Sequence, residues 1–424
     1  MLNSLQVSMR GLPARFLLGA AVFLASAAFA AGAGWAQEEE QSKEETEERE
    51  RPLYWDDGLF FRSPDGRLKV QFGAALQNDT TTFVREADIE TLLGSLEGGV
   101  AWRRARVYAH GYFAKHLEFK LQYDFATRNP PNLKDAYVGL INLPIPFLPN
   151  VWAGRFRSPL SLEGYTKAND LTFLERSLMT VFLPSRNTGI VFHGDSPDRR
   201  MKWSVAFVQQ ENDFGIQISG NASLTARFST AFKPKNTLVH LGVDYAKRNV
   251  IDETIRFLER PESHIAPQFV DTGDFPAEAA RSVFFEGAVA RGPLSIQGEY
   301  ASTSVDSTEI GDPRFHTYYV FASYFLTGES RPYNTDRGAF GRPRPKREFR
   351  DGSGGLGAIE LAFRFSRVDL TDQGIDGGEL NNFTAAVNWY PTHHLRVMFN
   401  SIIAKRSGNN HAVGIFQARL QIAF

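Results

Sequence analysis

Hydrophobic and polar residues alternate along most of this chain, and the alternation is clearest at its end. Between Gly414 and Phe424, one set of alternate residues is apolar, and the other set carries Gln417, Arg419 and Gln421. Successive side chains of a β-strand point to opposite faces, so the pattern predicts a strand with one apolar and one polar face. The same pattern recurs in residues 117–125, 359–365 and 383–389.

Sixteen such segments are separated by turns rich in Pro, Gly and Asn. Their predicted spans are 67–78, 101–114, 116–126, 133–142, 150–157, 187–194, 200–209, 222–233, 236–247, 281–291, 294–304, 315–327, 355–368, 380–391, 394–405 and 411–424. An even number of long alternating strands in this size range is typical of porins, whose barrels enclose an aqueous channel. The predicted fold class is all-β: a transmembrane antiparallel β-barrel with inward-folded loops. A soluble β-sandwich is the alternative, but it rarely places a charge or amide at nearly every alternate position.

Connection lengths predict a barrel with two unlike ends. Tight turns at Lys115, Lys235, 292–293 and 391–393 each follow an even-numbered strand, whereas the long connections after strands 5, 7, 9 and 11 follow odd-numbered ones. Outer-membrane barrels have this asymmetry, with short periplasmic turns and long extracellular loops.

One connection, residues 328–354, breaks this parity. It follows the twelfth strand and should be a short turn, yet it is long and rich in Gly and Pro. Basic residues outnumber acidic ones in this segment. The basic residues are Arg331, Arg337, Arg342, Arg344, Lys346, Arg347 and Arg350. We expect this segment to fold into the lumen or to line its periplasmic mouth; a solvated basic loop is the alternative.

The N-terminal residues are typical of an exported protein. Arg10 and Arg15 precede an apolar stretch at 16–30, and small residues at Gly34 and Ala36 then predict a signal peptide of residues 1–36. Cleavage after Ala30 and an N-terminal membrane anchor are the alternatives. Residues 37–52 form an acidic polar leader, expected to be a flexible spacer or a short helix, and residues 53–424 form the predicted barrel domain. After Ala36 the sequence contains no stretch of about 18 apolar residues that predicts a membrane helix.

Composition and charge agree with a membrane barrel. The chain has 47 basic and 48 acidic residues, but without residues 1–36 and the acidic run 38–50 the balance is 43 to 40. The neutral total therefore hides a slightly basic body. Aromatic residues make up 13% of the chain, which suits a wide lipid-facing surface. There is no cysteine, so no disulfide contributes to stability.

Basic residues are the candidate chemistry of this chain. The connection after the fifth strand and its flanks carry Arg155, Arg157, Lys167, Arg176 and Arg186, beside the acids Glu163, Asp170 and Glu175. Arg104, Arg106 and Lys120 lie opposite the lipid-facing alternation and should point inward, because a cation facing lipid near midplane costs roughly 2–4 kcal/mol. These side chains could form an anion-binding constriction. Alternatively, they only solvate the lumen wall.

Other chemistry has little support in the sequence. No phosphate-binding glycine loop, His-Glu-x-x-His zinc motif or nucleophile elbow occurs, so no catalytic residue, cofactor or metal is predicted. Export and the lipid-facing pattern also argue against a nucleic-acid partner.

Several segments together resemble the phosphate-selective porins O and P of Gram-negative outer membranes. These segments are 55–59 (WDDGL), 103–106 (RRAR), 118–125 (EFKLQYDF), 134–138 (KDAYV), 154–159 (GRFRSP), 170–177 (DLTFLERS), 357–365 (GAIELAFRF) and 388–391 (NWYP). The resemblance implies a sixteen-stranded homotrimeric barrel in outer-membrane lipid, with inward-folded loops and an Arg- and Lys-lined passage for phosphate.

The sequence therefore predicts a passive outer-membrane channel for small inorganic anions, with phosphate or polyphosphate as the solute that the resemblance implies. A general non-specific porin, a barrel-embedded hydrolase, and an adhesin or structural barrel with a plugged lumen are the alternatives.

Overall fold

The structure is a computed structural model and describes residues 52–84, 94–126, 132–145, 147–184, 186–209, 222–250, 253–350, 352, 354–407 and 412–424. The predicted signal peptide and all of the acidic leader except Pro52 lie outside the described residues, so both remain predictions.

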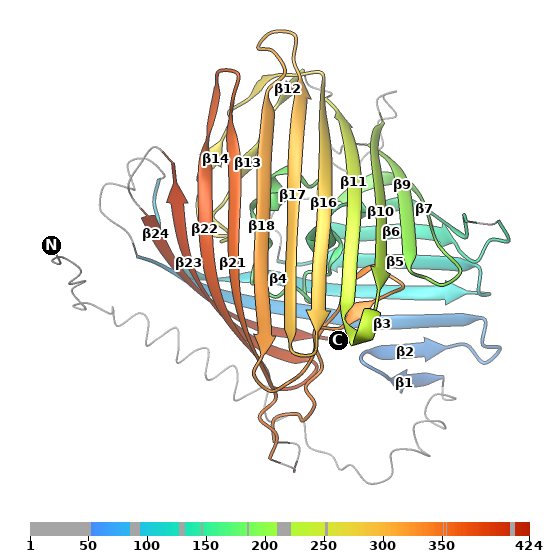
Figure 1. The fold of residues 1–424 in the computed structure, drawn as a ribbon. Helices are drawn as coiled ribbons and strands as arrows, with labels where there is room; N and C mark the ends of the chain where they lie inside the picture. The colour runs from blue at the N-terminus through green and yellow to red at the C-terminus, as the bar shows by residue number, and fades with distance from the viewer. Residues whose placement is uncertain are drawn as a thin grey trace. The chain divides into compact units, whose positions relative to one another are not determined.

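Sixteen antiparallel strands form a closed barrel (Figure 1). They are β3 (Leu68–Val84), β4 (Gly99–Phe113), β5 (Leu117–Asp124), β6 (Leu133–Leu140), β7 (Asn150–Arg157), β8 (Arg186–Asp195), β9 (Met201–Gln209), β10 (Ser223–Phe232), β11 (Leu238–Asn249), β16 (Ala279–Arg291), β17 (Leu294–Asp306), β18 (Arg314–Phe325), β21 (Ala358–Asp372), β22 (Ile375–Tyr390), β23 (Leu395–Arg406) and β24 (Ala412–Ala423). The barrel closes where β24 pairs with β3, from Ala423 opposite Ala75 to Gly414 opposite Val84. All sixteen predicted strands are confirmed, although several ends differ; β3, for example, continues to Val84.

The two faces of the strands follow the alternation in the sequence. On β24, Phe416 is exposed on the outer surface, whereas Gln417, Arg419 and Gln421 are buried inside the barrel. Closure gives each of the sixteen described barrel strands a partner on both sides, because lipid would not tolerate an unpaired edge. In the part of the chain that the structure describes, no helix is long and apolar enough to cross a membrane.

A short hairpin that the sequence did not predict precedes the barrel. It comprises β1 (Leu53–Trp55) and β2 (Leu59–Arg62), and β2 pairs with the first residues of β3. The ring of Trp55 lies 5.2 Å from that of Phe424. The hairpin therefore continues the edge of β3 beyond the point where β24 ends. Its strands are too short, and exposed on both faces, to give an alternation signal.

The longer connections contain short elements of their own. The connection after β7 contains α4 (Leu162–Tyr165) and the 3₁₀ turn η1 (Leu178–Phe182). The connection after β11 pairs β12 (Thr254–Ile255) with β15 (Phe275–Pro276) and β13 (Leu258–Glu259) with β14 (Val270–Asp271). The connection after β18 contains the hairpin β19 (Tyr333–Asn334) and β20 (Ala339–Phe340). The turn η2 (Pro234–Asn236) joins β10 to β11.

One side of the inner wall is apolar, unlike the polar lumen face that β24 shows. Phe315, Tyr319 and Phe321 of β18 are buried inside the barrel. The ring of Phe173 lies 5.4 Å from that of Phe321, and the ring of Phe257 lies 5.6 Å from that of Phe315. The connections after β7 and β11 therefore fold inward and cover this wall. Burying each such side chain contributes about 1.5–3 kcal/mol, which holds the connections inside the barrel.

Candidate functional site

Two carboxylates of the barrel wall hold the inward connection after β7. Asp244 of β11 accepts a hydrogen bond from the backbone N–H of Ser161 at 2.6 Å. Glu299 of β17 accepts from the N–H groups of Leu162 and Glu163 at 3.0 and 2.7 Å. These donors are the free N–H groups that begin α4, and the side-chain oxygens of Asp244 and Glu299 satisfy them. The position of the inward segment is thus fixed from the opposite wall.

Arg176 holds the same segment together from within. Its guanidinium donates to the carbonyls of Glu163 and Thr166 at 3.0 and 2.7 Å, at the end of α4. Burial lowers the pKa of Arg176, and the positive charge of Arg186 lowers it further. The negative charges of Glu163 and Glu175 raise it, and the net result is a pKa of about 10. Because its polar contacts in the structure are carbonyl oxygens of this segment, Arg176 positions the segment rather than presenting a free donor to the lumen.

A buried ion network joins the first strands, the last strand and the inward segment. Arg419 of β24 donates to both oxygens of Asp79 on β3, at 2.6 and 2.7 Å, and to Glu175 at 2.8 Å. Arg103 adds a bidentate pair with Glu175 at 2.7 and 2.9 Å. Burial raises the pKa of Glu175, but its arginine neighbours outweigh this and hold the pKa well below the ordinary value.

Two carboxylates of this network, with a nearby histidine, have the spacing of possible metal ligands. The ligand atoms of Asp79, Glu175 and His264 lie within 4.8 Å of one another. Both carboxylates are already paired with arginines, which supply the positive charge that a cation would bring. Burial, followed by the charge of Arg103, lowers the pKa of His264 to about 4. The arrangement therefore fits an ion-pair network and not a metal centre.

A β-bulge explains why Arg103 was missing from the residues expected to point inward. The β3–β4 register shifts between Gln77, opposite Arg104, and Asn78, opposite Trp102. Arg103 is the extra residue, so it and Arg104 both reach the interior. Arg104 is buried and donates to Gln77 at 2.5 Å, and it lies 3.8 Å from Glu175. A lost alternation across Trp102, Arg103 and Arg104 is the only sequence signal of the bulge.

The remaining bases lie mainly along the wall from β4 to β8. Arg106 pairs with Asp124 at 2.7 Å. Asp135 of β6 accepts from both Lys120 and Arg186, at 2.5 and 2.6 Å. Arg157 forms no ion pair within the described ranges, and its charged neighbours are Arg176, Arg186, Asp135 and Arg106. These bases, which we call the wall cluster (Arg106, Lys120, Arg157 and Arg186), outnumber the carboxylates that pair with them.

The side chain of Arg155 does not lie on the inner face of β7. Trp152 donates to the lumen residue Glu118, and Phe156 is buried, so these two residues mark the inner face of β7. Arg155 and Arg157 both occupy the other alternate positions. Arg155 donates to the carbonyl of Leu133 at 2.9 Å. Arg157, the last residue of β7, lies opposite Arg186 and has Arg176 of the inward segment and Asp135 among its charged neighbours.

Lys167 and Arg337 form a second basic pair, from the connections after β7 and β18. The charge of Arg337, followed by desolvation inside the barrel, lowers the pKa of Lys167 to about 8, and the side chain of Lys167 remains exposed. Lys120 and Arg342 act in the same direction, so the pair lies close to the wall cluster. Neither Lys167 nor the side chain of Arg337 has an ion pair in the described parts of the chain.

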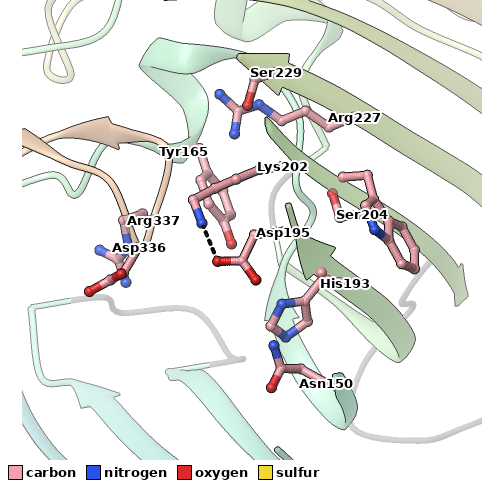
Figure 2. Close-up of a pocket in the computed structure, with 12 residues that line it drawn as sticks. Asn150, Tyr165, His193, Asp195, Lys202, Ser204, Arg227, Ser229, Asp336 and Arg337 are labelled. Atoms are coloured by element: carbon pink, nitrogen blue, oxygen red, sulfur yellow. Dashed lines mark hydrogen bonds and ion pairs between the residues drawn. The ribbon is translucent and has the colours of Figure 1, made fainter. Parts of the chain in front are cut away.

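Arg337 also lines a cavity of about 100 Å³ between the β19–β20 hairpin and the wall from β7 to β10 (Figure 2). The cavity is bordered by Tyr165, His193 and the ion pair of Lys202 with Asp195, at 3.2 Å. A cavity of this size holds a few water molecules or one small anion. Its wall residues were not predicted, because single polar positions on β8–β10 give no distinct pattern.

The segment after β18 divides into an inner and an outer part. In the inner part, Arg331 is buried, donates to Gln297 at 2.7 Å and lies 3.8 Å from the ring centre of Phe340. Arg227 of β10 donates to the carbonyl of Gly338 at 3.1 Å. Arg342 donates to the carbonyl of Ala423, near the end of the chain.

The outer part of this segment is solvated. Arg344, Lys346 and Arg347 are exposed, and Arg344 pairs with Asp57 of the first hairpin. The two readings of this segment, a lumen lining and a solvated basic loop, thus describe different halves of it.

The closed barrel, its apolar outer face and its basic inner wall define an outer-membrane porin. The family model described as phosphate-selective porin O and P matches residues 82–424, and the chain belongs to this family. It lies in the bacterial outer membrane as a multi-pass β-barrel.

Individual relatives agree with this assignment. The chain is 23% identical to Porin O of Pseudomonas aeruginosa over 411 residues, which are 87% of this chain and 91% of Porin O. It is 30% identical to an uncharacterized protein of Caulobacter vibrioides over 213 residues, which are 47% of this chain and 42% of that protein.

Solved structures share the fold at low sequence identity. An anion-selective porin from Comamonas acidovorans superposes with a TM-score of 0.52 at 12% identity, covering 84% of this chain and 100% of the porin. The trimer form of OmpT, an outer-membrane protein of Vibrio cholerae, gives 0.52 at 10% identity, covering 84% of this chain and 99% of OmpT.

Proposed function

We propose that this porin is a passive channel for small anions, with phosphate or polyphosphate as its solute, and that the bases between β4 and β8 line its passage. The observation that carries this proposal is the surplus of cations over carboxylates in the wall cluster, together with Lys167 and Arg337, which form no ion pair with any described residue. Positive side chains along a passage favour anions and hinder cations.

Arginine suits an oxyanion solute because its planar fork can donate two parallel hydrogen bonds to phosphate. Several moderate sites in sequence pass an ion along, whereas one deep site would trap it. Arg157, Lys167 and Arg337 are the proposed solute contacts, because no carboxylate in the described ranges pairs with them. Arg104, Arg106, Lys120 and Arg186 act as paired cations that set the surrounding potential. Arg176 holds the inward segment in place.

The proposal extends to the parts of the chain that the structure does not test. Residues 1–36 serve as the signal peptide, and residues 37–52 precede the barrel as an acidic spacer. The mature protein assembles as a homotrimer in outer-membrane lipid; the trimer form of the similarly folded OmpT supports this assembly.

The proposal that phosphate is the solute is tested by measuring how strongly added phosphate blocks the chloride current through the channel. We expect Arg157→Ala and Lys167→Ala to weaken the block several-fold, because each removes an unpaired cation, and Arg155→Ala to weaken it less. Lys233→Ala, in an exposed turn, is the matched control. Unchanged block in both of the first two variants would reject these residues as solute contacts. A general porin would show no phosphate block in the unaltered protein, and a plugged barrel would show no current.

A further inference from the structure

Three cations form a row on the outer surface of the barrel, away from the lumen. Lys247 of β11 lies opposite Arg281 of β16, Arg281 lies opposite Ser304 of β17, and Ser304 lies opposite Arg314 of β18. Directly opposed residues in antiparallel strands share a face. Arg281 shares its face with the outward Phe285, which is 55% exposed, so the row faces the membrane.

The outward positions of β16 show how deep this row lies. Between Arg281 and Arg291, the outward residues are Val283, Phe285, Gly287 and Val289. Ten residues span about 34 Å along a strand. A tilt of about 40° reduces this to roughly 26 Å across the membrane, close to the ~25 Å apolar band of such barrels. Arg281 and Arg291 therefore mark the two boundaries of the hydrocarbon.

The level of Arg281 belongs to the outer leaflet. Arg291 precedes the two-residue turn at 292–293, whereas Arg281 follows the long connection after β11, and short turns lie on the periplasmic side. Four residues nearer the membrane centre, Phe285, Tyr300 and Tyr318 form an aromatic row in the same register. This aromatic row lies within the apolar band, so the cations at the level of Arg281, at the boundary of that band, lie among the headgroups.

The charge of the row is only partly neutralised. Asp306 pairs with Arg281 at 2.5 Å, and the side chain of Arg281 remains 49% exposed. Asp372 accepts from the backbone N–H of Arg314 at 2.8 Å, which leaves the guanidinium unused. Across the described parts of the chain, no carboxylate forms an ion pair with Lys247 or with the side chain of Arg314.

We propose that Lys247, Arg281 and Arg314, with the hydroxyl of Ser304 between them, bind the phosphorylated headgroup of an outer-leaflet glycolipid. Three strand spacings of ~4.8 Å make the row about 14 Å long, enough for a headgroup with more than one phosphate. Guanidinium and ammonium groups make charge-assisted hydrogen bonds with phosphate. The acyl chains would lie on the apolar surface below the row, over Val283, Phe285 and Tyr300.

Native mass spectrometry of the full barrel in detergent micelles tests the site. The probe is an acylated disaccharide lipid that carries two phosphates, compared with the same lipid after enzymatic removal of the phosphates. We expect the phosphorylated lipid to be retained and the dephosphorylated lipid to be lost. Equal retention of both lipids would overturn the proposal.

Substitutions then locate the site. Each cation near a lipid phosphate should contribute about fivefold to the affinity, so Lys247→Ala/Arg281→Ala/Arg314→Ala should weaken binding on the order of 100-fold. Arg314→Ala alone, whose side chain holds no other group, should weaken it about fivefold even if the triple variant folds poorly. Arg291→Ala is the matched control, on the same face of the same strand at the other boundary. Unchanged binding in the Arg314 variant, or an equal loss in the Arg291 variant, would refute the site. Channel conductance should stay unchanged in all of them, which separates this test from that of the anion channel.

Discussion

At the scale of single residues, Asp135 controls how much positive charge the inner wall presents. Its carboxylate accepts from Lys120 and Arg186 together. We expect Asp135→Asn to leave both cations without a counter-charge and to raise the preference for anions several-fold, because the field in the enclosed lumen is weakly screened. The anion-to-cation permeability ratio measures this, and Asp198→Asn in an exposed turn is the control. A permeability ratio equal to that of the unaltered barrel would place Asp135 away from the ion path.

Lys167 should make the channel sensitive to pH. The nearby charge of Arg337 is the largest cause that lowers the pKa of Lys167 to about 8, so this lysine loses its charge as the pH rises from 7 to 9. Anion block should therefore weaken over this range. Sulfate is the suitable probe, because its charge does not change there. Arg337→Ala should move the midpoint to higher pH, and Lys167→Arg should remove the dependence. Persistence of the same midpoint in Lys167→Arg would assign the titration to another group.

Sequence reasoning identified the bases but not their partners. It placed Arg104, Arg106 and Lys120 on the inner face correctly, because alternation fixes the side of a strand. It could not show that Arg176 donates its hydrogen bonds to carbonyl groups of its own segment, because such contacts depend on how the connection folds. Arg103 was missed because a bulge breaks the alternation on which the inference depends.

At the scale of elements, the junction of β3 and β24 combines backbone pairing with buried charges. Arg419, Asp79 and Glu175 join the last strand, the first strand and the inward segment. We expect Asp79→Asn to destabilise the barrel by about 3–5 kcal/mol, because the buried guanidinium of Arg419 loses its bidentate partner and keeps only Glu175, which it shares with Arg103. The free energy of unfolding in urea measures this, with the exposed Asp65→Asn as control. A loss no larger than that of the control would show that the network contributes little to closure.

All sixteen strands could be predicted from sequence, whereas the filling of the barrel could not. Strand positions follow from local alternation over long segments. The contact of Phe173 with Phe321 joins residues far apart in the sequence, and no periodicity reports it. The apolar residues on the inner face of β18 are explained only by the connections after β7 and β11, which cover them. The long connection at 328–354 was a useful signal, because it follows an even-numbered strand, at the end of the barrel where the other connections are short turns. Such a long segment was therefore expected to fold into the lumen or line its mouth.

At the scale of the whole molecule, the barrel has two different surfaces with two kinds of cation. The inner wall holds bases beside the inward connections, and the outer wall holds a row of cations at the level of one leaflet. The same alternation that hides Arg419 inside exposes Phe416 to lipid. Membrane residence and passage of ions thus depend on opposite faces of the same strands.

The central claim is that this barrel passes anions in preference to cations. The most direct measurement is the reversal potential of the purified full barrel in a planar lipid bilayer under a gradient of potassium chloride. The wall cluster predicts steady, ohmic channels whose reversal potential has the sign of chloride selectivity, and a reduced chloride current when phosphate is added. A reversal potential of the sign expected for potassium selectivity, or no conductance from correctly folded protein, would contradict the account.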